Sequence, residues 1–139
     1  MEDPETIHSL LKNSKTIAIV GLSDKPDRDS NEVGRYLKSH GYRVIPVNPS
    51  VPEVLGERSY PSLQAIPSEV QIDIVDVFRK SDAVPGIVKD LLQRTPLPKA
   101  LWLQLGVTDA PSGAMVRQHG ISFIEDQCIM VRHRALFPG

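Results

Sequence analysis

The sequence predicts an α/β fold: a doubly wound, mostly parallel sheet of five to six strands with helices on both faces. Short apolar segments, typical of buried strands, alternate along the chain with segments whose apolar residues recur at helical spacing. The connections are short, and no linker, repeat or low-complexity stretch interrupts them. The 139 residues match the length of one ordinary domain, so we expect residues 1–139 to form a single domain.

Five segments are predicted to be strands, and a sixth to be a short edge strand. The clear strands are 16–20, 43–47, 72–78, 100–105 and 121–124, and the edge strand lies around 58–60. Pro46 weakens the prediction for the second strand, because proline cannot donate a hydrogen bond to a sheet ladder. Right-handed crossovers favour the Rossmann-like strand order 3-2-1-4-5 with one more strand beside it.

Helices are predicted between the strands, over residues 3–13, 29–40, 81–92 and 109–119, with a helical turn at 62–66. Asp29 and Glu32 have capping-box spacing, and Ser81 or Asp82 is a candidate cap for the third helix. Near the end of the chain, His133 lies in the basic segment 132–134, which we interpret as a solvated tail.

Composition argues against several classes of protein. The net charge is −1, from 16 Lys and Arg against 17 Asp and Glu, so no broad basic field is available for a nucleic acid. No apolar run approaches the roughly 18 residues needed to cross a bilayer, and the acidic start is not a signal peptide. The single Cys128 fits a reducing compartment. The four histidines show no metal-ligand spacing. We therefore expect a cytoplasmic protein without a metal site.

The loop after the first strand is a candidate phosphate site. In a doubly wound sheet, ligands bind beyond the carboxyl ends of the strands. Here Gly21, Leu22 and Ser23 are followed by Lys25 and Arg28, and then by a helix start, where free N–H groups favour an anion. The loop is interpreted either as a pyrophosphate cradle or as a polar loop with two solvated cations, and spacing alone does not decide.

The dinucleotide fingerprint is missing. No G-x-G-x-x-G follows the first strand, since the next glycine after Gly21 is Gly34. The second strand ends in Val47, Asn48 and Pro49 and not in an acidic residue that would hold a ribose. Both absences argue against an NAD-dependent dehydrogenase.

The remaining strand ends offer further candidates, each with a structural alternative. Phe78 could lie against an adenine and Arg79 could meet a phosphate, or they could be a core aromatic and a surface cation. Gln104 follows Trp102 on the same strand face, and if buried it needs hydrogen-bond partners. Cys128 follows the last strand, where a free cysteine is usually a small buried hydrophobe.

Several segments of the chain resemble one known family. These are AIVGLSDKPDRDSNEVGRYLKSHGYRVIPVNP (18–49), LGERSYPSL (55–63), DIVDVFRKSDAVPGIV (73–88), ALWLQLGV (100–107) and EDQCI (125–129). In this order they are similar to the small stand-alone CoA-binding proteins, and to the CoA-binding domain of the succinyl-CoA synthetase alpha subunit and of NDP-forming acyl-CoA synthetases. The resemblance covers nearly the whole chain.

The resemblance implies a coenzyme A site at matching positions. The Gly21-Leu22-Ser23 loop with Lys25 and Arg28 would take the pyrophosphate, and Val47, Asn48 and Pro49 would line the adenosine side. Phe78 and Arg79 would close the nucleotide pocket, Gln104 and Gly106 would border the pantetheine arm, and Cys128 would lie near the thiol.

The resemblance also limits the expected activity. The synthetases carry a phosphorylated histidine in a second domain, for which this sequence has no counterpart. We therefore expect a protein that binds CoA or an acyl-CoA without catalysis. Two alternatives stay open: a nucleotide-dependent enzyme, either an NAD(P) oxidoreductase or a CoA enzyme that uses Cys128, and a protein–protein adaptor with an empty crevice.

Overall fold

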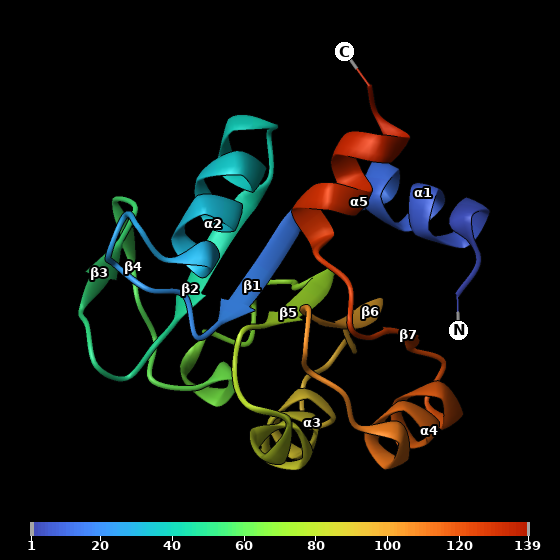
Figure 1. Ribbon diagram of the computed structural model, residues 1–139. Coiled ribbons are helices and arrows are strands. Elements are labelled where there is room, and N and C mark those ends of the chain that lie inside the picture. Colours follow the sequence, from blue (N-terminus) through green and yellow to red (C-terminus); the bar gives the residue numbers. More distant parts are fainter. Residues whose placement is uncertain (1, 139) are drawn as a thin grey trace.

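The computed structural model describes residues 2–138 and has a parallel sheet at its centre (Figure 1). Its five strands are ordered β2-β1-β5-β6-β7 and comprise β1 (Thr16–Val20), β2 (Arg43–Val47), β5 (Ile74–Val77), β6 (Ala100–Leu103) and β7 (Ser122–Ile124). A separate antiparallel pair, β3 (Glu53–Val54) and β4 (Glu57–Arg58), lies beyond β2. The predicted α/β fold is therefore confirmed.

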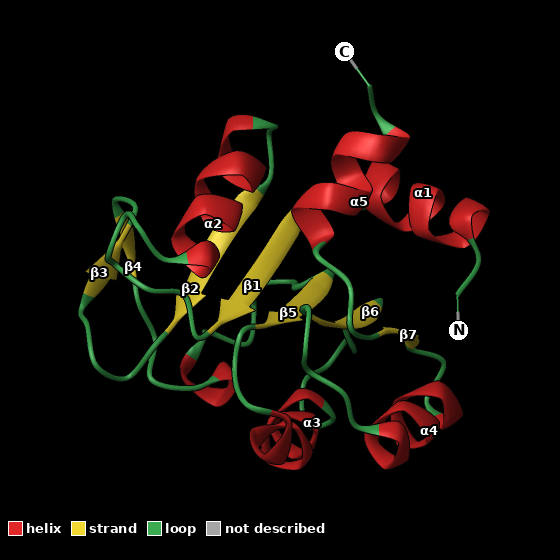
Figure 2. Ribbon diagram, viewed as in Figure 1, coloured by secondary structure: helices red, strands yellow, loops and turns green. Residues whose placement is uncertain are grey.

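Helices cover both faces of the sheet (Figure 2). One face carries α1 (Pro4–Asn13), α2 (Asp29–Ser39) and α5 (Ile129–Leu136), and the other carries α3 (Val84–Leu91) and α4 (Ala110–Gln118). Each face has its own apolar core, because alternate residues of a buried strand point to opposite sides. In β1, for example, Ile17 and Ile19 pack toward α1, α2 and α5, whereas Ala18 and Val20 pack toward α3 and α4. None of the helices in residues 2–138 is long and apolar enough to span a membrane.

The predicted strand order holds, but the predicted third strand is reduced to one bridge. Tyr60 forms a single parallel bridge with Val47 at the outer side of β2. The amide of Tyr60 donates to the carbonyl of Pro46, so the proline nitrogen also faces this outer side, where the sheet needs no donor. Pro46 is thus compatible with β2. Because it has no N–H to donate, the outer side of β2 cannot form a regular ladder with a further strand.

Two of the proposed helix caps are wrong. Arg28, and not Asp29, is the N-cap residue of α2, so Asp29 lies inside the first turn and cannot form the expected capping box with Glu32. Ser81 begins a short 3₁₀ turn (Ser81–Ala83), and α3 starts only at Val84. The Ser81 hydroxyl instead accepts a hydrogen bond from the Thr108 amide at 2.9 Å. By contrast, Asp3 caps α1 through the Thr6 amide, and Asp109 caps α4 through the Ser112 amide.

The segment interpreted as a solvated tail is part of helix α5, which the sequence analysis missed. His133 is 6% exposed and shares a 2.7 Å hydrogen bond with the Tyr36 hydroxyl of α2. Its ring lies edge-on to His40 and stacks on Phe137. An aromatic cluster therefore attaches α5 to α2, and this attachment places the start of α5 at the carboxyl ends of the strands.

Candidate functional site

Three pockets adjoin one another along the carboxyl edge of the sheet. The β1 pocket (380 Å³) lies over the loop after β1, the β2 pocket (440 Å³) lies between the end of β2 and α3, and the β6 pocket (520 Å³) lies between α2, the end of β6 and the start of α5. The β1 and β6 pockets share Asp29 and Phe78, and the β2 and β6 pockets share Arg79. Together they form one trough with Phe78 and Arg79 at its middle.

The loop of the β1 pocket is held in one shape by its own polar groups. The Ser23 amide donates to the Ser30 hydroxyl at 2.9 Å, and the Asn31 amide group donates to the Ser23 carbonyl at 2.9 Å. The Ser23 hydroxyl accepts from the Lys25 amide at 3.1 Å. These bonds tie the loop to the first turn of α2, whose first N–H groups have no partner within the helix. The β1 pocket is therefore lined by a preformed helix N-terminus.

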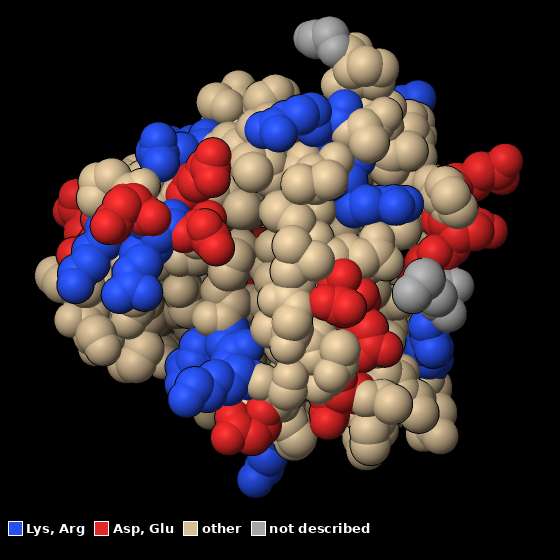
Figure 3. Space-filling view, in the orientation of Figure 1, with Lys and Arg blue, Asp and Glu red and all other residues tan. Residues whose placement is uncertain are grey.

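The cations of the trough have no protein partner. Within residues 2–138, the side chains of Lys25, Arg28 and Arg79 make neither a hydrogen bond nor an ion pair, and all three residues are exposed. Two arginines elsewhere differ: Arg35 donates to Asn31 and to a backbone carbonyl, and Arg94 donates to four backbone carbonyls. Figure 3 shows Lys and Arg side chains gathered beside the loop after β1 and below the ends of β1 and β5. The arrangement suits a ligand with more than one negative group.

The β6 pocket has a fixed polar wall and a thiol. Gln104 is 4% exposed, and its side-chain oxygen accepts from the Ile129 amide at 3.1 Å, so this residue joins β6 to the first residue of α5. Cys128 is a free, half-buried cysteine and is the N-cap residue of α5. Phe78 and Arg79 form the side of the pocket that faces the other two pockets.

Comparisons with known proteins identify the family of the chain. The family model for the CoA binding domain matches residues 15–134. The chain belongs to the CoA-binding domain family. The protein YneT of Bacillus subtilis (strain 168) is 41% identical over 135 residues, which cover 96% of this chain and 97% of YneT. The alpha subunit of acetate–CoA ligase (ADP-forming) II of Pyrococcus furiosus is 39% identical over 69 residues, which are 49% of this chain but only 15% of that subunit.

Solved structures share the whole fold of this CoA-binding domain. A protein of Pyrococcus horikoshii OT3 superimposes with a TM-score of 0.90 at 36% identity, over 97% of this chain and 92% of that one. A protein of Thermus thermophilus has a TM-score of 0.90 at 34% identity, over 98% of this chain and 100% of its own.

The structure brings most of the predicted site residues of this CoA-binding domain into the trough. The pockets are lined by Gly21, Ser23, Lys25, Arg28, Val47, Pro49, Phe78, Arg79, Gln104 and Cys128. Three predicted residues have other positions. Leu22 is fully buried in the core, the Asn48 amide group donates to the Leu22 carbonyl at 3.0 Å, and Gly106 donates its N–H to Asp126 at 2.7 Å. These three residues shape the loops around the trough and do not line its pockets.

Several lining residues were not predicted. Asp29, Glu32 and Lys80 line the β6 pocket, as do Met130 and Val131 of α5. The last two could not be placed without knowing that α5 exists. A strand-end rule does find Lys80, because it directly follows Arg79 at the end of β5.

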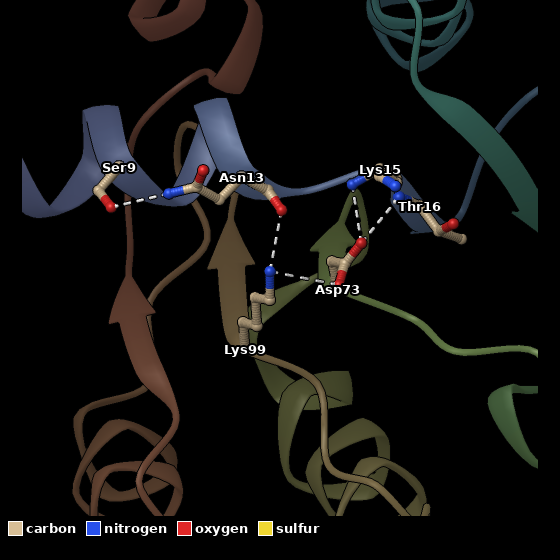
Figure 4. A network of polar contacts seen from close by, with 6 residues as sticks. All are labelled: Ser9, Asn13, Lys15, Thr16, Asp73 and Lys99. Atoms are coloured by element: carbon tan, nitrogen blue, oxygen red, sulfur yellow. Dashed lines mark hydrogen bonds and ion pairs between the residues drawn. The ribbon is translucent and has the colours of Figure 1, made fainter.

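The opposite edge of the sheet has a different polar arrangement (Figure 4). The Asp73 carboxylate accepts from the Lys15 amide at 2.7 Å and the Thr16 amide at 3.0 Å, and lies 3.7 Å from the ammonium of Lys99. Lys99 also donates to the Asn13 carbonyl at 2.9 Å. Asp73 thus ties the amino ends of β1, β5 and β6 together, far along the strands from the trough.

Proposed function

We propose that this chain binds coenzyme A or an acyl-CoA in the trough through its phosphates and its adenine, and that it does not catalyse a reaction by itself. The observation that carries the proposal is the set of three adjoining pockets with unpaired cations in the β1 pocket and beside it. Membership of the CoA-binding domain family supports the choice of ligand.

Each pocket is proposed to hold one part of the ligand. The diphosphate would lie in the β1 pocket, against the first turn of α2 and the cations Lys25 and Arg28. The adenosine would lie in the β2 pocket, between Val47, Pro49 and the start of α3. The pantetheine arm would follow the β6 pocket past Gln104 toward Cys128. Arg79 borders two pockets and would interact with the phosphates from the opposite side.

The charges support this assignment. Coenzyme A carries roughly three to four negative charges, counting a diphosphate and a phosphate monoester whose second pKa is about 6. Lys25, Arg28 and Arg79, with the positive end of the α2 dipole, offset most of this charge locally. The overall charge of −1 is no obstacle, because only the local field acts on the bound phosphates.

The proposed lack of catalysis rests on the site's composition. Within residues 2–138, Cys128 has no hydrogen bond to a histidine or carboxylate that could serve as its base. The ligase activity in the name of the Pyrococcus furiosus relative belongs to a chain of which this sequence matches 15%. We infer a cytoplasmic protein that stores, senses or delivers its small-molecule ligand.

Calorimetry and thermal unfolding with CoA, NAD and NADP test the proposal. CoA should raise the melting temperature, because a ligand that binds only the native state stabilises it. Arg28→Ala should weaken CoA binding at least about fivefold, which corresponds to about 1 kcal/mol. Arg43→Ala is the matched control, because Arg43 is an exposed arginine at the amino end of β2.

Two results would overturn the proposed binding site, and a third would overturn the proposed lack of catalysis. One is stabilisation by NAD with no effect of CoA, which would indicate an oxidoreductase. The other is an equal CoA affinity for the wild type, Arg28→Ala and Arg43→Ala, which would remove the phosphate site. Turnover of a CoA substrate that is lost in Cys128→Ser would show that the chain is an enzyme after all.

A further inference from the structure

The far end of the β6 pocket is apolar and exposed. Among residues 2–138, the large hydrophobic side chains that are exposed are Leu105 (67%), Val131 (53%) and Met115 (47%). The first two line the β6 pocket, together with Val107 and Met130. They come from the end of β6 and the start of α5, and not from the strand ends that border the β1 pocket. Exposed apolar residues gathered at a pocket mark a place where a ligand covers them.

Acidic residues lie on the loops next to this apolar end, although they do not line the pocket itself. Asp126 is fixed beside it, since its carboxylate accepts from the Gly106 amide at 2.7 Å and its own amide donates to the Val107 carbonyl at 3.2 Å. Glu125 accepts from the Asp109 amide at 3.1 Å, which places a second and a third acidic residue next to the same loop. Figure 3 shows Asp and Glu side chains grouped on this side of the molecule, apart from the basic groups.

The cations of the pocket lie at its other end. Arg79 and Lys80 follow β5, on the side shared with the phosphate-binding part of the trough. The arginines of α5, Arg132 and Arg134, do not line the pocket, and Arg134 lies over the Tyr36 ring. On the α2 wall the pocket has two more carboxylates, Asp29 and Glu32. Beside the apolar end the loop residues Glu125 and Asp126 are acidic, whereas the two cations that line the pocket, Arg79 and Lys80, directly follow β5.

We infer that the β6 pocket receives the acyl end of a thioester whose acyl group is short, neutral and apolar, and that it disfavours acyl groups ending in a carboxylate. This inference rests on the proposed function and specifies the ligand. A free thiol would leave Leu105 and Val131 in water, whereas an aliphatic acyl group would cover them. A terminal carboxylate would lose its hydration next to Glu125 and Asp126 without gaining a cation.

Competition binding with CoA, acetyl-CoA, butyryl-CoA and succinyl-CoA tests the inference. Butyryl and succinyl have the same four-carbon length, so they differ mainly in the terminal charge. Each buried methylene should tighten binding up to about fourfold, so butyryl-CoA, with two more methylenes, should bind up to about fifteenfold more tightly than acetyl-CoA. Succinyl-CoA should bind at least about tenfold more weakly than butyryl-CoA at low salt, and this difference should shrink as salt increases.

Two sets of variants assign the effect to this end of the pocket. Leu105→Ser and Val131→Ser should reduce the advantage of butyryl-CoA over CoA, whereas Met115→Ser, which changes an exposed residue of α4, should not. The double variant Glu125→Gln, Asp126→Asn should raise the affinity for succinyl-CoA relative to butyryl-CoA severalfold. Its amide oxygens can still accept the bonds from Asp109 and Gly106, and asparagine tolerates the positive φ of 56° at position 126.

The outcomes separate this inference from the proposed function. If CoA itself does not bind, the proposed function is wrong and the inference falls with it. If CoA binds but the four ligands have equal affinities, or succinyl-CoA binds as tightly as butyryl-CoA, the CoA site stands and the acyl preference is refuted.

Discussion

The charged residues at the two ends of strand β5 differ in whether they have a protein partner. At the amino end, the Asp73 carboxylate is engaged by two backbone amides and faces Lys99 across 3.7 Å (Figure 4). At the carboxyl end, Arg79 has no partner within residues 2–138, and neither has Lys25 or Arg28 across the pocket. Asp73 and Lys99 thus have structural roles at one edge of the sheet, whereas Lys25, Arg28 and Arg79 have no protein partner among the described residues at the other edge.

The two edges also differ in how their charged groups contribute to the stability of the fold. The polar groups at the amino edge satisfy each other, so they stabilise the fold in the absence of any ligand. At the carboxyl edge, Lys25 and Arg28 line a pocket at a helix N-terminus, which also carries positive charge. An anionic ligand would interact with these side chains, which contribute nothing to the fold through a protein partner within residues 2–138. Stability and binding should therefore respond to different substitutions.

The largest expected effect is the loss of Asp73. Asp73→Ala removes a charged acceptor from two backbone N–H groups, and each such bond contributes about 1.5–3 kcal/mol. The free energy of unfolding, measured by urea denaturation, should fall by about 3–5 kcal/mol, while the folded variant keeps its affinity for CoA. Asp82→Ala, an exposed acidic residue near the carboxyl end of β5, should change stability by less than about 0.5 kcal/mol. A folded Asp73→Ala protein with weakened CoA binding would break the separation of the two edges.

Gly21 tests whether a residue of the trough can also be structural. Its φ is +90°, and a Cβ added there would lie 2.5 Å from the carbonyl oxygen of Phe78. Gly41 has nearly the same φ, +92°, but nothing within 4 Å of such a Cβ. Gly41→Ala should therefore cost only the backbone strain, about 1–2 kcal/mol. Gly21→Ala should cost at least about 1 kcal/mol more in denaturation experiments, and should also weaken CoA binding by displacing Phe78. Equal losses in the two variants would contradict this close packing.

The fold was predictable from the sequence because its strands are buried on both faces. The segments 16–20 and 43–47 match β1 and β2 residue for residue. The predicted strand 72–78 was too long, because apolar residues continue at Ile72 and Phe78 although the ladder with β1 and β6 covers only residues 74–77. Apolar character alone therefore indicates that a strand exists but not where its hydrogen bonds end.

Helix α5 was missed because its buried face includes a histidine. Ile129, Met130 and His133 are its buried residues, and His133 is flanked by two arginines. Only the facing rings of Tyr36, His40 and Phe137 make that position a core position, and they come from distant parts of the sequence or from the helix end.

The topology of the sheet explains how much of the candidate site could be predicted. Carboxyl ends of parallel strands meet at one edge, so the sequence alone was enough to group Lys25, Arg28 and Arg79. It was not enough to decide whether a strand-end side chain points into the trough. Asn48 and Gly106 are next to pocket residues in sequence, but their hydrogen bonds hold loops together.

His133 offers a further test, because the fold disfavours the protonated form of this basic residue. Burial lowers the pKa of His133 below its usual value of about 6.5, and the neighbouring His40 lowers it further. Tyr36, His40 and Tyr42 surround the ring, and no carboxylate within residues 2–138 forms an ion pair with it. As pH falls below about 6.5 the unfolded chain binds a proton that the folded protein resists. The free energy of unfolding should therefore decrease by up to about 1.4 kcal/mol per pH unit.

Asp76 changes stability with pH in the opposite direction to His133. The effect of His133 must therefore be measured as a difference between the wild type and a His133 variant. Its carboxylate is fully buried, and burial raises its pKa well above the usual value, which favours the folded state as pH falls. Both the wild type and His133→Asn contain Asp76. Subtracting their unfolding free energies between pH 7.5 and 5.5 therefore isolates the histidine. The wild type should lose more stability on acidification than His133→Asn, whereas His119→Asn, at an exposed histidine, should follow the wild type. Parallel pH profiles for all three proteins would show that the fold does not lower the pKa of His133.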